Sequence, residues 1–354
     1  MAERLLMKGN EAMAEAVIQA GCRHFFGYPI TPQNEVCAYF SKRMPQVGGV
    51  YLQAESELAA INMVLGAASA GVRVITSSSS PGISLKTEGL SYLAGSDLPC
   101  LVVNVQRGGP GLGGIQPSQA DYYQATKAPG HGDTHILVLA PASVQEMVDL
   151  PYKAYELAER YRIPAMILAD GLLGQMMEPV QFSTIEVKQA EKPWATTGHE
   201  NKRKTNIVNS LYLDPAVLEE KVLERYERYA IVEANEVVFD SYLVDDAQLV
   251  LVAYGATSRI CKSAVNEARA QGLKVGLFRP ITLWPFPVKQ LYELAISGKQ
   301  FLTVEMNMGQ MVNDVRLAVN GKSPVSFYGR TGGMVPTPQE VFSKIQELLG
   351  GELS

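Results

Sequence analysis

Two glutamates, Glu55 and Glu57, stand where a short strand-like run, VYLQ at 50–53, gives way to a segment rich in alanine and apolar residues. In a strand the two carboxylates would share a face, whereas in a helix they would point in nearly opposite directions. Acidic residues favour helix N-termini, where they contribute about 0.3–1 kcal/mol. A carboxylate followed at once by apolar residues equally suits proton transfer, so the residues alone leave both roles open.

Four consecutive serines, residues 77–80, lie between a predicted strand and a predicted helix and are followed by Pro81 and Gly82. Serine hydroxyls commonly cap helix N-termini, and a Pro-Gly pair is typical of turns. The residues alone therefore favour a helix-capping role for Ser79 and Ser80, and a contact with a ligand is the alternative.

A rigid corner surrounds Thr31, because Pro29 and Pro32 bracket Ile30 and Thr31 directly after a predicted strand at 24–27. Proline fixes φ and removes a backbone donor, so the stretch YPITP predicts a stiff exit from the strand. The threonine hydroxyl is then held in a defined place at the end of a strand.

A glycine-rich loop follows Arg107, and its residues Gly109, Gly111 and Gly114 match the dinucleotide fingerprint G-x-G-x-x-G. The residues that follow, IQPSQ, contain Pro117 and do not begin a regular helix. No second strand that ends in an acid follows at about 20 residues, and no G-K-[ST] makes the loop a P-loop. We expect instead that the loop lets a backbone approach a ligand or a neighbouring subunit.

A parallel sheet would bring these four corners together. From residue 9 to about 175, apolar runs alternate with helical patterns, which indicates a doubly wound sheet buried on both faces. The predicted strands lie at 24–27, 50–53, 73–77, 101–106, 136–140 and 164–170. Ligands bind beyond the carboxyl ends of such strands, where all four corners fall.

A second α/β series begins near residue 248, so we predict an α/β protein with two doubly wound parallel-sheet domains. The stretch RPITLWPFP at 279–287 is predicted to form a turn within it. Between the two series the chain is polar and aperiodic, with one exposed helix suggested by LEEKVLERYERY at 218–229. The predicted division is a first domain at 1–177, a connecting segment at 178–246 and a second domain at 247–354.

Composition excludes several other classes of protein. The chain has 354 residues, a formal net charge of −5 and a pI near 5.6, which argues against a nucleic-acid groove. No apolar run approaches the roughly 20 residues of a membrane span, and the first residues lack the apolar region of a signal peptide, so we expect a cytoplasmic protein. Four scattered cysteines and four histidines have no spacing suited to zinc or an iron–sulfur cluster, so no metal is expected in this chain.

The order of these motifs resembles the alpha-type subunit of the 2-oxoacid:ferredoxin oxidoreductases, most nearly their branched-chain (2-oxoisovalerate) branch. The resemblance rests on MKGNEA at 7–12, GYPITPQNE at 27–35, QAESELAAIN at 53–62, SSSSPGISLK at 77–86, RGGPGLGG-x-QPSQAD at 107–121 and ADGLLGQMMEP at 169–179. Farther along, VAYG, RPITLWPFP and FLTVEMN are similar to the C-terminal domain of transketolase-like thiamine enzymes.

The resemblance implies a subunit of an enzyme that oxidatively decarboxylates a 2-oxoacid with coenzyme A and passes electrons to ferredoxin. Thiamine diphosphate would be shared: this chain would hold the aminopyrimidine ring, and a beta-type subunit would hold the diphosphate through magnesium. The thiamine motif G-D-G…N-N is missing here, in line with that division. Iron–sulfur clusters would lie in other subunits, and the implied partners also include a gamma-type subunit and a 4Fe–4S ferredoxin-like subunit.

Carried over by motif, Glu57 is the glutamate expected to hydrogen-bond the pyrimidine N1′ and favour the imino tautomer of the ring. It is preferred to Glu55 because it falls on the second acid of the family motif. Thr31 and Arg107 match residues expected near the substrate carboxylate, which the planar guanidinium fork can hold with two hydrogen bonds. The two prolines would keep the Thr31 hydroxyl aimed at substrate. The residues expected to border the cofactor, besides Glu57, are Tyr28, Pro29, Ile30, Ser79, Ser80 and Pro81.

Three other roles stay open at this point. A beta subunit of a lipoyl-linked 2-oxoacid dehydrogenase would use no ferredoxin, although YPITP and RGGPGLGG argue against it. In a catalytically silent assembly subunit, Glu57 would act only as a helix cap. In a dinucleotide dehydrogenase, the glycine-rich loop would bind the dinucleotide. Among substrates, 2-oxoglutarate would need an extra cationic partner for its distal carboxylate, and pyruvate would need a tighter pocket.

Overall fold

A seven-stranded sheet organises the N-terminal half of the computed structural model, which describes residues 4–182 and 191–350. Six of its strands are parallel and lie in the order β6-β7-β5-β4-β2-β3. They are β2 (His24–Gly27), β3 (Val50–Gln53), β4 (Val74–Ser78), β5 (Leu101–Gln106), β6 (Leu137–Leu139) and β7 (Ala165–Asp170). Every residue of β4 to β7 is buried, as expected for strands covered on both faces.

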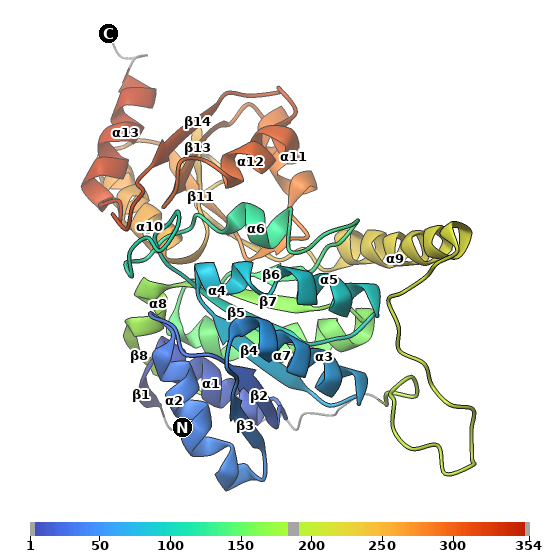
Figure 1. Ribbon diagram of the computed structural model, residues 1–354. Coiled ribbons are helices and arrows are strands. Elements are labelled where there is room, and N and C mark those ends of the chain that lie inside the picture. The colour runs from blue at the N-terminus through green and yellow to red at the C-terminus, as the bar shows by residue number, and fades with distance from the viewer. Residues whose placement is uncertain (1–3, 183–190, 351–354) are drawn as a thin grey trace.

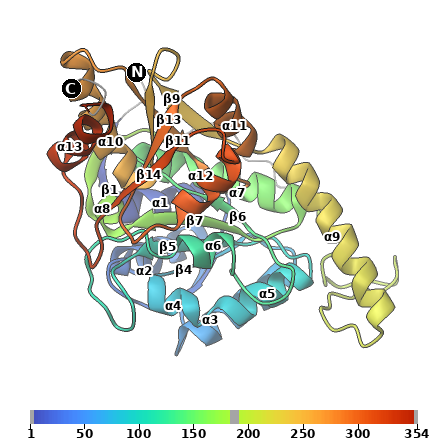
Figure 2. The same ribbon diagram turned by 90° about the horizontal axis from the view of Figure 1, so that it is seen from above.

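Helices cover both faces of this sheet, which confirms the predicted doubly wound architecture (Figures 1 and 2). One face carries α1 (Gly9–Gln19), α2 (Asn34–Arg43) and α7 (Val144–Tyr161), and the other carries α3 (Glu57–Ser69), α4 (Ser80–Ser84) and α5 (Thr87–Gly95). Three short helical segments complete this half: η1 (Pro45–Val47), α6 (Tyr122–Thr126) and α8 (Gly171–Gln175).

The sheet reverses its direction of growth at β2. The chain runs outward from β2 to the edge strand β3 and then crosses back to β4 on the other side of β2. The crevice at the carboxyl ends of β2 and β4 is therefore the topological switch point, where open α/β sheets bind ligands. The YPITP corner leaves β2 there, and the serine run ends β4 there.

A smaller sheet of five strands forms the C-terminal half, in the order β14-β13-β10-β11-β9. Its strands are β9 (Phe239–Tyr242), β10 (Leu249–Val252), β11 (Val275–Pro280), β13 (Gln300–Glu305) and β14 (Val325–Gly329), of which β9 is antiparallel. Helices α10 (Gly255–Ala270) and α13 (Pro338–Gly350) pack together, as do α11 (Val288–Ile296) and α12 (Met311–Val319). The second doubly wound unit is confirmed, and α13 is an element that the sequence pattern did not indicate.

Two local predictions are wrong. The stretch 279–287 is not simply a turn, because β12 (Thr282–Trp284) crosses to the first sheet and pairs antiparallel with β6. The stretch 178–246 is not without strands, because β8 (Met177–Val180) pairs with β1 (Leu5–Lys8) and β9 joins the second sheet. These short strands, MEPV, FDSY and TLW, contain or adjoin proline or acidic residues, which are more typical of turns and loops than of strands.

The exposed helix expected at 218–229 is longer, because α9 spans Pro215–Asn235. Asp214 caps it by accepting a hydrogen bond from the Ala216 amide, and proline suits its first position. The helix projects from the side of the molecule (Figure 1, yellow). Residues 183–190 of the polar stretch lie outside the described residues. Across the described ranges, no helix combines the length and hydrophobicity needed to cross a bilayer.

Candidate functional site

Glu57 lies at the first position of α3, and its side chain is buried, with 7% of the residue exposed. Ser56 is the actual cap, since its hydroxyl accepts a hydrogen bond from the Ala59 amide at 3.2 Å. The Glu57 carboxylate has no hydrogen bond or ion pair with any other described residue, and Glu55 is exposed. A buried carboxylate that the protein leaves without a partner is an acceptor available to a ligand.

The position of Glu57 shows how the helix is turned. Leu58, Ile61, Leu65 and Ala68 recur at spacings of three and four residues, but they do not together form the buried face of α3, because Leu58 is 46% exposed. The buried side of α3 consists of Glu57, Ala60, Ile61, Val64 and Ala68. The glutamate is therefore on the side of the helix that faces the sheet.

The serine run does not cap its helix. Ser79 occupies the N-cap position of α4, but its side chain makes no capping hydrogen bond, so the capping role expected from the residues alone is wrong for this serine. The hydroxyls of Ser78 and Ser79 are buried and have no hydrogen-bond partner among the described residues. Such atoms are costly unless a ligand or water satisfies them.

Ser80, in contrast, is held by protein groups that the motifs did not single out. Its hydroxyl donates to the Asp121 carboxylate at 2.6 Å and accepts from the Arg107 amide at 3.0 Å. The Asn104 side chain donates to the same carboxylate at 2.9 Å. Burial raises the pKa of Asp121, whereas these hydrogen bonds lower it. Ser80 therefore joins the serine run to the start of the glycine-rich loop.

Gly82 is the point where the serine run and Glu57 meet. A Cβ atom added at Gly82 would lie 2.1 Å from the Ser78 hydroxyl oxygen and 2.5 Å from a Glu57 carboxylate oxygen. Both distances are far shorter than real contacts, so a glycine is needed for the carboxylate to occupy this place. Glu57, Ser78 and Gly82 thus converge at the carboxyl ends of β2 and β4.

Thr31 and Arg107 lie side by side, but they contact each other through the backbone. The Arg107 guanidinium donates to the Thr31 carbonyl at 2.9 Å and to the Leu112 carbonyl at 3.2 Å. Its Nε atom is buried and has no hydrogen-bond partner in the part of the chain that the structure describes. The Thr31 hydroxyl accepts from the Asn34 side chain at 3.1 Å. Of the residues preceding Thr31, Tyr28 is 36% exposed, and Pro29 and Ile30 are partly exposed, as is Pro81 across the crevice.

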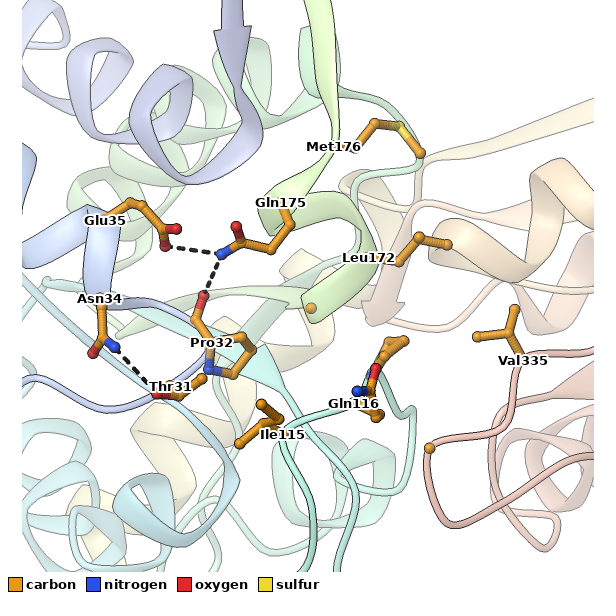
Figure 3. Close-up of a pocket in the computed structure, with 13 residues that line it drawn as sticks. Thr31, Pro32, Asn34, Glu35, Ile115, Gln116, Leu172, Gln175, Met176 and Val335 are labelled. Atoms are coloured by element: carbon orange, nitrogen blue, oxygen red, sulfur yellow. Dashed lines mark hydrogen bonds between the residues drawn. The ribbon is translucent and has the colours of Figure 1, made fainter.

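A pocket of about 790 Å³ opens next to Thr31 (Figure 3). Ile115, Leu172, Met176 and Val335 supply most of its apolar side chains, and no lysine or arginine lines it in the described part of the chain. The remaining lining residues are Thr31, Pro32, Asn34, Glu35, Gln116, Pro117, Gly171, Gln175 and Gly333. Gly333 and Val335 belong to the second half of the chain, a long-range contact that no local motif could indicate.

The glycine-rich loop does not have the geometry of a dinucleotide site. The Gly114 amide donates to the Gly108 carbonyl at 2.9 Å, which closes the loop on itself. The next helix, α6, begins only at Tyr122, so no helix N-terminus follows the glycines to hold a pyrophosphate. Among the described residues, no three His, Cys, Asp or Glu side chains gather as metal ligands, and the four cysteines are buried free thiols.

Two family models match the chain: pyruvate flavodoxin/ferredoxin oxidoreductase, thiamine diphosphate-binding, over residues 15–242, and pyruvate:ferredoxin oxidoreductase core domain II over residues 247–341. The chain is 50% identical over 346 residues to the ketoisovalerate oxidoreductase subunit VorB of Methanothermobacter thermautotrophicus, covering 98% of each protein.

Two of the solved structures that are similar to the chain show how far that likeness extends. The 2-oxoglutarate:ferredoxin oxidoreductase from Magnetococcus marinus matches with a TM-score of 0.85 and 28% identity, over 98% of this chain and 65% of that chain. This chain therefore spans less than two thirds of that protein. A split-gene transketolase, in its inactive beta4 tetramer, matches with a TM-score of 0.60 and 13% identity, which shows a shared fold alone.

Proposed function

We propose that this chain, which belongs to the pyruvate flavodoxin/ferredoxin oxidoreductase family, supplies the aminopyrimidine half of a shared thiamine diphosphate site. The chain is a subunit of a 2-oxoacid:ferredoxin oxidoreductase, as its motifs predicted. One observation carries the proposal: the Glu57 carboxylate is buried at the switch point of the sheet and has no protein partner among the described residues.

The residues around Glu57 fit a flat, polar ring. Glu57 would accept the hydrogen bond of the ring nitrogen N1′, and the unpartnered hydroxyls of Ser78 and Ser79 would satisfy other polar atoms at the ring edge. Gly82 leaves room for this contact, because a side chain there would strike Glu57. Tyr28, Pro29, Ile30, Ser80 and Pro81 would form the walls. When bound, thiamine diphosphate supplies the nucleophilic carbon and the electron sink for decarboxylation.

Thr31 and Arg107 would orient the carboxylate of the 2-oxoacid. The unpartnered Nε of Arg107 offers a buried donor in addition to the two nitrogens that already hold backbone carbonyls. A charge-assisted hydrogen bond from a guanidinium to a carboxylate is stronger than one between neutral groups. The prolines on either side of Thr31 would already restrict its backbone conformation. The threonine would therefore lose little conformational entropy when substrate binds.

The pocket beside Thr31 supports a branched-chain 2-oxoacid, with 2-oxoisovalerate as the proposed substrate. Its apolar residues Ile115, Leu172, Met176 and Val335 suit an aliphatic side chain. No lysine or arginine among the described residues lines the pocket to meet the distal carboxylate of 2-oxoglutarate, and the nearby Lys8 already forms an ion pair with Glu35 at 3.2 Å. The volume of about 790 Å³ is larger than pyruvate needs.

The rest of the active site would come from partners. A beta-type subunit would bind the diphosphate through magnesium, and iron–sulfur clusters would lie in a 4Fe–4S ferredoxin-like subunit and other partners, with a gamma-type subunit completing the complex. Coenzyme A would take the acyl group and ferredoxin the electrons. The buried free cysteines suit a reducing, cytoplasmic location. The proposed division remains 1–177 for pyrimidine binding, 178–246 as connection and 247–354 as the transketolase-like domain. Residues 1–3, 183–190 and 351–354 of it lie outside the described residues.

The test is to co-express the chain with the subunits encoded beside it and to measure viologen reduction that depends on coenzyme A. We expect kcat/KM to be highest with 2-oxoisovalerate, ahead of 2-oxoglutarate and pyruvate. Glu57→Gln should lower the rate by about 10²–10⁴-fold, the range typical of a lost proton-transfer group. The matched control is Glu55→Gln, two residues away and exposed, which should behave as wild type.

Each alternative has its own outcome in this assay. Full activity of Glu57→Gln in an assembled complex would make Glu57 a structural residue and would disprove its proposed role. Loss in Glu55→Gln instead would exchange the two assignments. Preference for 2-oxoglutarate or pyruvate would reject the substrate, and transfer of the acyl group to a lipoyl acceptor without ferredoxin reduction would favour the lipoyl-linked dehydrogenases.

A further inference from the structure

Asp121 ends the QPSQAD stretch that follows the glycine-rich loop, and its carboxylate forms no ion pair with any described residue. One carboxylate oxygen accepts from the Ser80 hydroxyl at 2.6 Å and from the Asn104 side-chain amide at 2.9 Å. The Asn104 side-chain oxygen accepts in turn from the Ser80 amide at 3.2 Å, so the three residues form a closed ring of hydrogen bonds. A hydroxyl bonds more strongly to a carboxylate than to a neutral acceptor, so Asp121 sets the direction of the Ser80 hydroxyl.

The direction of the Ser80 hydroxyl matters for Arg107. The same hydroxyl oxygen accepts from the Arg107 backbone amide at 3.0 Å. A hydroxyl has one proton, and when that proton points to Asp121 the oxygen lone pairs are left for the amide. The Arg107 carbonyl lies 3.2 Å from the hydroxyl and is the acceptor to which the proton would turn without Asp121. Asp121 therefore fixes the backbone of Arg107 through one intervening hydroxyl.

Arg107 needs this support because the chain that follows it is rich in glycine. Five of the seven residues from 108 to 114 are glycines, whose backbones have many accessible conformations. The Arg107 guanidinium donates to the Leu112 carbonyl of this loop at 3.2 Å and to the Thr31 carbonyl at 2.9 Å. A fixed backbone at the start of the loop therefore determines where the guanidinium lies.

Asp121 is itself held in place from the second half of the chain, through Gln119. Gln119 is buried, with 0% of the residue exposed, and its backbone amide donates to the Met306 carbonyl at 3.0 Å. Its side chain donates to the Tyr254 carbonyl at 2.9 Å and accepts from the Met306 amide at 3.1 Å. The Asn307 side chain donates to the Gln119 carbonyl at 2.7 Å. The strand ends of the second half thus anchor the chain two residues before Asp121.

We propose that Asp121 is a positioning residue that acts through the Ser80 hydroxyl and holds Arg107 where its guanidinium can bind the carboxylate of the 2-oxoacid. The inference rests on the proposed function of Arg107. Asp121 contacts Ser80 and Asn104 and is not itself a group that touches substrate. The second half of the chain then contributes to substrate binding, because Gln119 anchors the segment that carries Asp121.

The experiment measures KM and kcat for 2-oxoisovalerate in assembled complexes that carry Asp121→Ala or Asp121→Asn. Asp121→Ala should raise KM by about tenfold and leave kcat within about twofold of wild type, because a lost binding contact shared by ground and transition states raises KM alone. Asp121→Asn should raise KM by about threefold, because its amide oxygen can accept the same two hydrogen bonds more weakly. The KM for coenzyme A should not change in either variant.

The matched control is Ser91→Ala, which removes a similar hydroxyl from α5. The Ser91 hydroxyl donates to the His131 carbonyl at 2.6 Å and accepts from the His131 amide at 3.1 Å, so it too holds the backbone of a loop residue. This variant should keep the wild-type KM for 2-oxoisovalerate. A rise in KM equal to that of Asp121→Ala would show that loosening any such loop is enough, and would overturn the inference.

A double-mutant cycle with Arg107→Gln separates the inference from the proposed function. If Asp121 acts through Arg107, Asp121→Ala should raise KM no further once the guanidinium is absent. An additive effect, or a wild-type KM in Asp121→Ala when Arg107→Gln raises KM, would overturn the inference. If Asp121→Ala does not assemble, Asp121→Asn replaces it in the cycle under the same criteria. If Arg107→Gln itself leaves KM unchanged, the proposed function of Arg107 fails instead.

Discussion

Two buried glutamates at strand–helix junctions, Glu57 in the first half of the chain and Glu305 in the second, are treated in opposite ways. The Glu305 carboxylate, with 0% of the residue exposed, accepts hydrogen bonds from the Asn307 side chain and from the backbone amides of Gln310, Met311 and Val312, at 2.8–3.3 Å. The Glu57 carboxylate accepts none from any described residue. Burial of a carboxylate therefore does not by itself indicate a functional residue. The indication is a buried carboxylate that accepts no hydrogen bond from the rest of the fold.

The comparison extends from the two acids to the two strand ends around them. In the described residues from 248 onward, Thr303 Oγ1 is the one buried side-chain oxygen or nitrogen without a partner. The described residues before 248 contain eight such atoms, and three of them, Ser78 Oγ, Ser79 Oγ and Arg107 Nε, belong to the ends of the neighbouring strands β4 and β5. Glu305 caps the start of α12, whereas α3 already has Ser56 as its cap. Glu57 is thus free for a ligand because another residue performs the local structural task.

The largest effect that tests this comparison is the loss of rate in Glu57→Gln without a loss of stability. The substitution should lower kcat by about 10²–10⁴-fold, because the group that exchanges a proton with the ring is gone. The unfolding free energy should change by less than about 1 kcal/mol, because no hydrogen bond within the chain is broken. Urea denaturation alongside the activity assay checks both parts. A large loss of stability would place Glu57 in the same class as Glu305.

Glu305→Gln should show the reverse. An amide has one oxygen to replace a carboxylate that accepts four hydrogen bonds, and its own NH₂ group would meet amide donors, so we expect a loss of about 3 kcal/mol of unfolding free energy. Activity per folded molecule should stay near that of wild type. The same denaturation series measures the loss, and a selective fall in kcat with unchanged stability would contradict the structural role assigned to Glu305.

Asp170, at the end of β7, is a third buried carboxylate, and its contribution to the free energy of unfolding should depend on pH. Its carboxylate accepts from the amides of Leu172 and Leu173 at 2.9 and 3.1 Å, yet burial raises its pKa to about 6. A raised pKa means that the stability from this group is complete below about pH 4 and is lost as the pH rises through 6. Relative to wild type, Asp170→Asn should therefore gain about 2 kcal/mol in unfolding free energy between pH 4 and pH 7. Denaturation at both pH values tests this, and a constant difference would refute it.

Sequence patterns predicted the parts of the site that depend on one local segment. Apolar runs located the strands, and the order of β2 and β4 placed YPITP and the serine run at one crevice. The preference for Glu57 over Glu55 agrees with the helical phase, which buries the former and exposes the latter. Whether Glu57, Thr31 and Arg107 bind cofactor and substrate stays a prediction.

The parts that sequence patterns missed depend on contacts between distant segments. Asp121 and Asn104 hold Ser80 across the sheet, and Val335 reaches the pocket beside Thr31 from the other half of the chain. The capping role of Ser79 was mistaken for a related reason. A serine before a helix is a good local candidate, and only the three-dimensional arrangement shows that its hydroxyl makes no such bond.

The smallest expected effect comes from two glycines that differ only in the space around them. Gly66 lies in the exposed interior of α3, where an added Cβ would meet nothing within 4 Å, whereas a Cβ at Gly82 would strike Ser78 and Glu57. Gly66→Ala should stabilise the chain by about 0.5–1 kcal/mol, the helix preference of alanine over glycine. Gly82→Ala should weaken thiamine diphosphate binding by about tenfold, which corresponds to about 1.4 kcal/mol, because Glu57 must move. Calorimetric titration of both variants in the assembled complex gives the answer. Equal affinities would mean that the carboxylate can shift without loss, and that its position beside Gly82 is not what prepares the site.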